Sequence, residues 1–81
     1  MPFRIKFKNT LDHQVTIAIE PWGELLRMPS QSECLVEFAA IKEGHPEIVL
    51  EDKAISIYGW RGSTFRVQAG EIVLKSEVPS P

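Results

Sequence analysis

The sequence predicts an all-β fold, a small antiparallel β-sandwich of seven or eight short strands. Apolar and polar residues alternate with a period of two in one segment after another, and this spacing puts the apolar side chains on one face of a strand. Gly, Pro, Asn, Asp or Ser interrupts the alternation about every 6–12 residues, and no stretch keeps the 3.6-residue period of a helix. The pattern leaves the strand order undecided between immunoglobulin-like, cupredoxin-like and jelly-roll arrangements.

Four of the expected strands lie in the first half of the chain. The first alternates apolar side chains with Arg4, Lys6 and Lys8, which suits a strand near a sheet edge because charge there discourages pairing with another molecule. Pro21 ends the second strand, since proline has no N–H to give to the ladder. We expect these strands at residues 3–8, 13–20, 25–28 and 33–40, with turns at residues 9–12 and 29–32.

Four further strands are expected in the second half, where glycine, proline and aspartate again separate the alternating segments. Gly70 can supply the positive φ of a tight hairpin turn between the last two strands. The strands are expected at residues 47–51, 54–60, 64–68 and 71–78, with a turn at Asp52–Lys53. The side chains expected to face the core are Ile48, Leu50, Ile55, Ile57, Phe65, Val67, Ile72 and Leu74.

Composition limits the chain to one small domain. The 81 residues are expected to form a single domain over residues 1–78 with a disordered tail at 79–81. The net charge of −2 argues against a general nucleic-acid binder, which usually carries an excess of Lys and Arg. The single cysteine, Cys34, allows no internal disulfide, and no apolar run has the roughly 20 residues that cross a membrane. These features predict a cytoplasmic protein without a membrane partner.

Strand direction predicts which loops meet. If each strand reverses the direction of the one before it, the loops at residues 21–24, 41–46 and 61–63 share one end of the sandwich, provided that the short strand at 25–28 forms. Six side chains that carry aromatic or ionisable groups would then gather at that end. They are Glu20, Trp22, Glu24, His45, Trp60 and Arg61.

A metal site or a catalytic nucleophile has little support. Two His, one Cys and two Met could in principle form a blue-copper site, but Met28 precedes Cys34 and His45 follows 11 residues later, unlike the usual tight cluster. Cys34 also falls on the core face of its strand, where a thiol is inert. No Gly-x-Ser-x-Gly elbow, P-loop or dinucleotide fingerprint occurs. We therefore expect that the chain has no enzymatic activity and binds no cofactor or metal.

The loop around Trp22 has two interpretations. Glu20 and Glu24 flank the indole, and paired carboxylates are used in sugar chemistry. Such chemistry needs a cleft, and an 81-residue sandwich rarely has room for one. The favoured interpretation is that Trp22 folds back as a plug over the open end of the core.

Tyr58 and Trp60 form a second aromatic corner. Strand parity puts both on the face away from Ile55 and Ile57, with Arg66 of the next strand as a possible cross-strand neighbour. Aromatics beside arginine match the makeup of interaction hot spots. This face could be a contact surface, most simply a homodimer interface, or it could be covered, either by a loop or as a second buried face in a sheet wrapped on both sides. Both alternatives stay open.

Residues 15–24, VTIAIEPWGE, followed by a turn at Pro29, resemble a group of small uncharacterised bacterial proteins. Members of that group share a strand, a Glu-Pro-Trp-Gly-type loop and a Pro-x-Gly-type turn. The match covers about a quarter of the chain and departs from the pattern at Gln31, where a turn glycine would be expected. The resemblance implies a bacterial, non-enzymatic β-domain in which Trp22 has a structural role, and it implies no activity.

The sequence as a whole favours a protein-binding or assembly module with a protein partner or a homo-oligomeric state. The candidate contact residues are Trp22, Tyr58, Trp60, Arg61 and Arg66. One alternative is a small-ligand receptor, for instance for a carbohydrate, with Trp22 and Trp60 as stacking platforms. A second alternative is a small enzyme or metal protein that uses His45 with Glu20 or Glu24.

Overall fold

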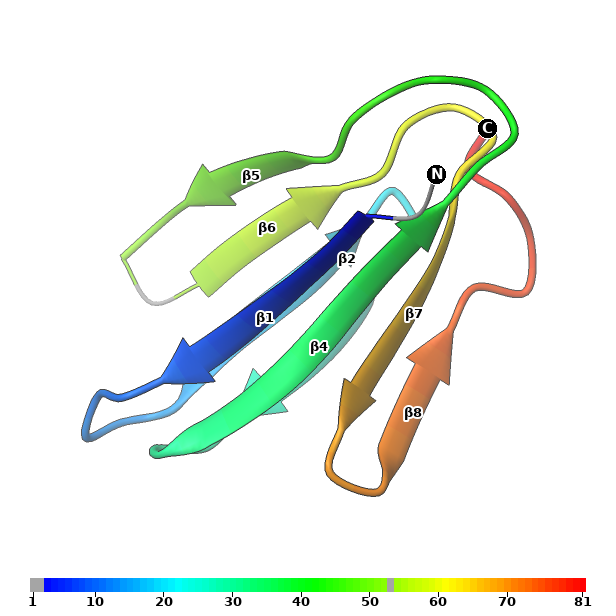
Figure 1. Cartoon of the computed structure of the whole chain (residues 1–81). Coiled ribbons are helices and arrows are strands. Elements are labelled where there is room, and N and C mark those ends of the chain that lie inside the picture. The colour runs from blue at the N-terminus through cyan, green and yellow to red at the C-terminus, as the bar shows by residue number, and fades with distance from the viewer. Residues whose placement is uncertain (1–2, 53) are drawn as a thin grey trace.

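The protein is an all-β sandwich of eight strands, which confirms the predicted fold class (Figure 1). The structure, a computed structural model, describes residues 3–52 and 54–81. The strands are β1 (Phe3–Asn9), β2 (Val15–Glu20), β3 (Glu24–Met28), β4 (Ser32–Ala39), β5 (Glu47–Leu50), β6 (Ala54–Tyr58), β7 (Thr64–Ala69) and β8 (Ile72–Lys75). Within these residues, no helix is long and apolar enough to cross a membrane.

The strands form two sheets of four. Sheet A has the order β1-β4-β7-β8 and is antiparallel throughout, whereas sheet B has the order β3-β2-β6-β5 and is mixed, because β2 and β6 run parallel. The prediction of a wholly antiparallel sandwich is therefore wrong for sheet B. Successive strands do reverse direction, and for that reason two even-numbered strands that become neighbours must be parallel.

The expected sorting of the loops onto two ends is confirmed. The short strand β3 forms, so the connections at residues 21–23, 40–46 and 59–63 all lie at one end of the sandwich, together with the C-terminus (Figure 1). We call this the loop end. The turn expected at Asp52–Lys53 includes Lys53, which lies outside the described residues.

Two strands are shorter than the alternating pattern predicts. The strand expected over residues 54–60 ends at Tyr58, because the chain turns back where the Ser63 N–H donates to the Trp60 carbonyl oxygen at 2.9 Å. The strand expected over residues 71–78 ends at Lys75, where the Ser76 Oγ accepts the Phe65 N–H at 2.9 Å in place of a strand partner. Side-chain hydrogen bonds of this kind compete with the ladder.

The C-terminal residues differ from the disordered tail expected at 79–81. Ser80 is buried, its N–H donates to the Ser63 carbonyl oxygen at 2.8 Å, and its carbonyl oxygen accepts the Gly62 N–H at 2.8 Å. The end of the chain therefore lies against the connection between β6 and β7.

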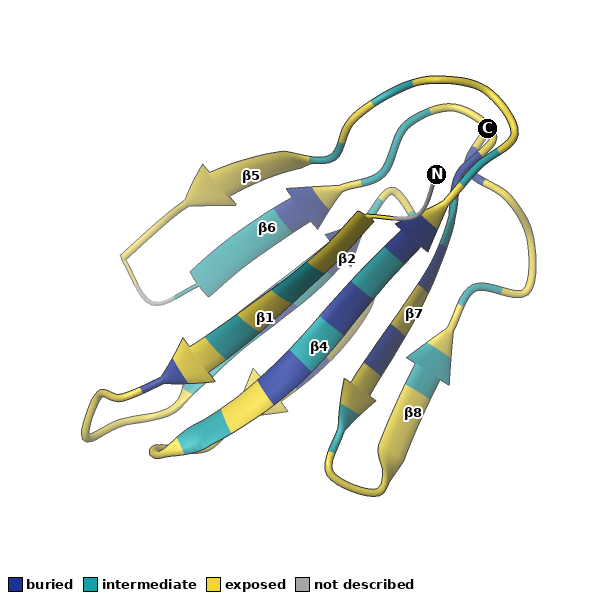
Figure 2. Cartoon of the chain, viewed as in Figure 1, coloured by how far each residue is buried: buried dark blue, intermediate teal, exposed yellow. Residues whose placement is uncertain are grey.

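The core lies between the sheets and comes from alternate residues of the central strands (Figure 2). The parity predicted for β2, β4, β6 and β7 is confirmed, since their inward side chains are the ones that lose contact with solvent. The buried core residues are Ile17, Ile19, Leu26, Met28, Cys34, Val36, Phe38, Ile57, Phe65 and Val67.

Asn9 joins the two sheets at the end opposite the loop end. Its side chain is buried, and Nδ2 lies 2.9, 3.1 and 3.0 Å from the carbonyl oxygens of His13, Met28 and Pro29. Its Oδ1 accepts the Leu11 N–H at 3.0 Å. One side chain thus satisfies the backbone of the β1–β2 loop and of the β3–β4 turn.

We expect Asn9→Ala to lower the free energy of unfolding by about 2–3 kcal/mol, because it leaves buried carbonyl oxygens without a donor. Urea unfolding followed by fluorescence measures this change. The matched control is Gln31→Ala, whose exposed Nε2 donates to the Thr10 carbonyl oxygen at 3.0 Å. Equal losses for the two variants would contradict the role given to Asn9.

Candidate protein-interaction surface

Trp22 closes the core at the loop end, as the favoured interpretation of its loop predicts. The half-buried indole packs edge-on against Phe65, with ring centroids 4.7 Å apart, and lies 6.4 Å from Phe38. Its Nε1–H donates to the Val78 carbonyl oxygen at 2.8 Å. A Cβ on Gly59 would lie 2.8 Å from Cη2 of the same ring, so glycine is required at that contact.

Trp60 belongs to the core rather than to the outer face where strand parity placed it. Its ring centroid lies 5.6 Å from that of Phe3 and 5.9 Å from that of Phe38, and its Nε1–H donates to the Lys42 carbonyl oxygen at 3.2 Å. A Cβ on Gly44 would overlap the indole, so the backbone of the 40–46 loop lies directly on the ring. The prediction failed because β6 ends at Tyr58, after which strand parity no longer applies.

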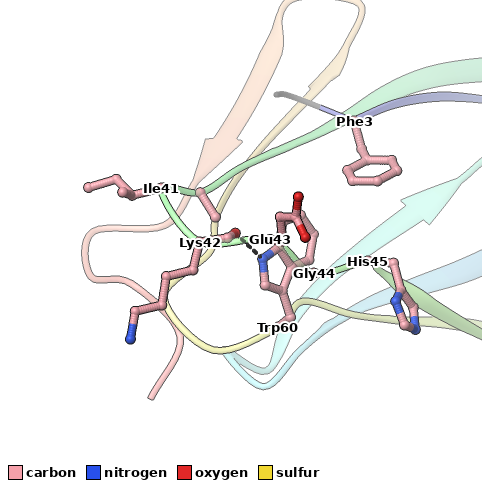
Figure 3. Close-up of a pocket in the computed structure, with 8 residues that line it drawn as sticks. Phe3, Ile41, Lys42, Glu43, Gly44, His45 and Trp60 are labelled. Carbon is pink, nitrogen blue, oxygen red and sulfur yellow. Dashed lines mark hydrogen bonds between the residues drawn. The ribbon is translucent and has the colours of Figure 1, made fainter.

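A hollow of about 630 Å³ lies beside Trp60 at the loop end (Figure 3). Phe3, Trp60 and residues 40–45 line it, while the side chains of Lys42 and His45 extend away from the indole on opposite sides. Both indole N–H groups are engaged by backbone carbonyl oxygens, and Gly44 covers part of the Trp60 ring. The geometry therefore gives little support to the two tryptophans as stacking platforms for a sugar.

The other candidate contact residues do not form one patch. Tyr58 is exposed on the outer face of sheet B, opposite Glu47 in the register, and Arg61 is exposed in the loop that follows. Arg66 lies on the outer face of sheet A, where its register partners are Glu37 and Lys75. Arg66 is not the cross-strand neighbour of Tyr58 that the sequence suggested as possible, because consecutive strands β6 and β7 belong to different sheets.

Cys34 is buried against the core, and its Sγ lies 3.8 Å from the Met28 Sδ. Burial raises the pKa of this thiol, since the charged thiolate loses its hydration there. Among residues 3–52 and 54–81, no group of three or more His, Cys, Asp and Glu side chains could hold a metal ion.

The side of the sandwich where β1 and β5 form the edges is open. All four residues of β5 are exposed, and Ile48 (41%) and Leu50 (76%) are among them although the register puts them on the same face as Ile57 and Ile55. Ile57 is fully buried, so the cover provided by sheet A ends over β6 and β5 projects beyond it (Figures 1 and 2). We call this region the open flank, defined by the edge strands β1 and β5 with the inward side chains Ile5, Phe7, Ile48 and Leu50.

The two edges of the open flank carry opposite charges. On the outer face of β1, Arg4 Nε lies 3.3 Å from a carboxylate oxygen of Glu37 and Lys6 Nζ lies 3.8 Å from one of Glu33, both on β4, and the basic series continues with Lys8. On the other edge, Glu47 begins β5 and Glu51 follows its last residue. Apolar side chains separate the charged ones on both strands, so each edge presents charge outward and hydrocarbon inward.

The opposite side of the sandwich, with edges β3 and β8, is better filled. Leu26 of β3 is buried and Leu74 of β8 is half-buried against the core. Ile72 remains exposed beside a hollow of about 520 Å³ that Met28 and Ala69 also line. Of the two sides, only the open flank leaves every residue of an edge strand exposed.

The open flank was missed in the sequence because Ile48 and Leu50 alternate like core residues. Alternation tells which side chains point the same way, but it does not tell whether a second sheet covers them. Two signals were present: the brevity of the β5 segment and its position between acidic residues, both typical of an edge.

Comparison with known proteins found no matching protein-family model, curated protein or solved structure.

The turn in which the sequence departs from the Pro-x-Gly pattern has a positive φ of 61° at Gln31. This is the left-handed backbone conformation that a turn glycine would adopt most easily. Gln31 therefore adopts the backbone conformation that a glycine would adopt at this position of the turn.

Truncating Trp22→Ala should lower the free energy of unfolding by about 3 kcal/mol, since it removes the aromatic packing at the loop end. Trp22→Phe should cost less, because it keeps ring contacts and loses only the N–H donor. Thermal and urea unfolding measure both changes. A Trp22→Ala variant as stable as the parent would show that the indole does not close the core.

Native Cys34 should react with a small thiol reagent at pH 8 at least about 100-fold more slowly than in urea, because burial disfavours the thiolate and blocks access. Release of the chromophore from a disulfide reagent measures both rates. A native rate within a few-fold of the unfolded rate would place the thiol at the surface.

Proposed function

We propose that this chain is a non-enzymatic protein-binding or assembly module whose contact surface is the open flank. The observation that carries the proposal is the exposure of β5 on all four residues, including the inward-facing Ile48 and Leu50. Uncovered apolar side chains on the core side of a sheet are costly in water, and a bound polypeptide would remove them from it.

The backbone of the open flank supports the same proposal. Among residues 3–52 and 54–81, β1 pairs with β4 alone and β5 with β6 alone, so one side of each edge strand presents N–H and C=O groups to its surroundings. A partner strand can add to such an edge through main-chain hydrogen bonds, with alternate side chains giving specificity. Nothing in β5 blocks this, since Pro46 and the glycines lie outside the strand.

Tyr58 adds to this surface from the outer face of sheet B. It lies on β6, one strand in from the free edge, where it is opposite Glu47 of β5 in the register and 41% exposed. An aromatic side chain next to an open strand edge suits a contact that also covers part of the outer face. Of the five contact residues suggested by the sequence, Tyr58 is the one that belongs to the proposed surface.

A cytoplasmic location is part of the proposal. It is supported by the single cysteine, whose reduced thiol is packed in the core beside Met28. A reducing compartment suits a domain that is stabilised by packing alone.

The test is site-specific photo-crosslinking in the cells that produce the protein. A benzophenone side chain at Val49, on the outer face of β5, should give one discrete cross-linked species, and the same group at Gln68 on sheet A should not. Leu50→Lys should abolish the product, because it puts a charge on the apolar side of the strand. Equal cross-linking from both positions, or none from Val49, would overturn the proposal.

A further inference from the structure

We propose that the polypeptide bound at the open flank is a second copy of this chain, with β1 of each copy pairing with β5 of the other. This inference rests on the proposed function and identifies its partner. It is carried by three observations. The side chains of the two edges match, β1 and β5 span similar heights, meaning positions between the loop end and the opposite end, and β5 projects beyond sheet A.

The two edges match at four of five positions, the exception being Lys6, which falls opposite Val49. Residues 4–8 of β1 read Arg-Ile-Lys-Phe-Lys, and residues 47–51 read Glu-Ile-Val-Leu-Glu. Side by side and parallel, they place Arg4 next to Glu47 and Lys8 next to Glu51 on the outer face. Ile5 and Phe7 then meet Ile48 and Leu50 on the inner face. Opposite charges and paired apolar side chains are the combinations that stabilise neighbouring strands.

The heights of the edges agree with this register. Glu47 is paired with Tyr58, next to the loop end where Phe3 contacts Trp60, so β1 and β5 both begin at that end. At the other end, Asn9 bonds to the carbonyl oxygen of Met28, which is paired with Val15. The next residue of β2, Thr16, is paired with Ala54, whose carbonyl oxygen accepts the N–H of Glu51. Lys8 and Glu51 therefore lie at similar heights, as a two-fold axis along the strands requires.

A two-fold axis parallel to the strands places sheet A of one copy level with sheet B of the other, and it preserves strand direction. Because β1 and β5 run in the same direction, it would make β1 and the partner's β5 parallel neighbours. Sheet A would then continue into the partner's sheet B, and the reverse would hold on the other side. The projecting β5 strands of the two copies would lie face to face, so Ile48 and Leu50 would pack against their own equivalents.

Other self-pairings are less favourable. An antiparallel pairing of β5 with itself through Val49 puts Glu47 against the partner's Glu51, and β1 paired with itself puts basic side chains together. Like charges on neighbouring strands are destabilising. Of these pairings, the one that joins β1 of each copy to β5 of the other brings unlike charges together and covers the apolar side chains of both edges.

Sedimentation velocity on the purified chain over a micromolar-to-millimolar range should show a monomer–dimer equilibrium. Leu50→Lys should remain monomeric throughout, with an unchanged unfolding midpoint, because Leu50 is mostly exposed in one copy. Gln68→Lys, on the outer face of sheet A, is the matched control and should dimerise like the parent. A parent chain that is monomeric at every concentration would overturn the inference.

Charge exchange tests the register. Lys8→Glu and Glu51→Lys should each weaken dimerisation about tenfold, since the two-fold axis repeats every substitution. The double variant should recover the parent affinity. Combining Lys8→Glu with Glu47→Lys should not, because that pair would be adjacent only in an antiparallel arrangement. Recovery by the second combination alone, or no effect of any reversal, would overturn the parallel pairing.

The proposed function and this inference fail differently. A monomeric chain whose Val49 benzophenone links to one other polypeptide, in a manner that Leu50→Lys abolishes, would refute the second copy and leave the binding function standing. A monomeric chain without any Val49 product would refute both. A Val49 product with the mass of two copies is the result expected here.

Discussion

The loop end of this sandwich depends on one buried ring, Phe38 at the end of β4. It contacts both indoles, at centroid distances of 6.4 Å to Trp22 and 5.9 Å to Trp60. Trp22 comes from the β2–β3 turn and Trp60 from the connection that crosses from sheet B to sheet A. The cluster therefore holds the two sheets together where their strands end, and Gly44 and Gly59 leave the space that the indoles need.

The two sheets are offset on the side of β1 and β5. Sheet A covers β6, whose Ile57 is buried, but it ends before β5, whose inward side chains stay in water. A domain of this size buries a limited share of its surface, and all four residues of β5 are left exposed. The proposed assembly relates this offset to function, because the exposed strand of one copy fits the exposed edge of the other.

The candidate surface was only partly predictable. Tyr58 was identified as exposed, and it is, since it is the last residue of a strand that obeys alternation. Trp60 was assigned to the same face and packs in the core, because the chain leaves the sheet at Gly59 and parity has no meaning in the turn. Arg66 was a possible neighbour of these aromatics but lies on the other sheet, since strands adjacent in sequence need not be adjacent in space.

The sequence by itself determined the fold class, the position of the eight strands, their alternating direction and the gathering of Trp22 and Trp60 at one end. These features follow from local rules: side chains alternate every residue along a strand, and prolines and glycines mark where strands end. Only the tertiary structure decided the parallel pairing of β2 with β6, the hydrogen bonds that hold Ser80, and the exposure of Ile48 and Leu50. Each of these depends on which segments become neighbours after the chain has folded, and a pattern of period two carries no information about that choice.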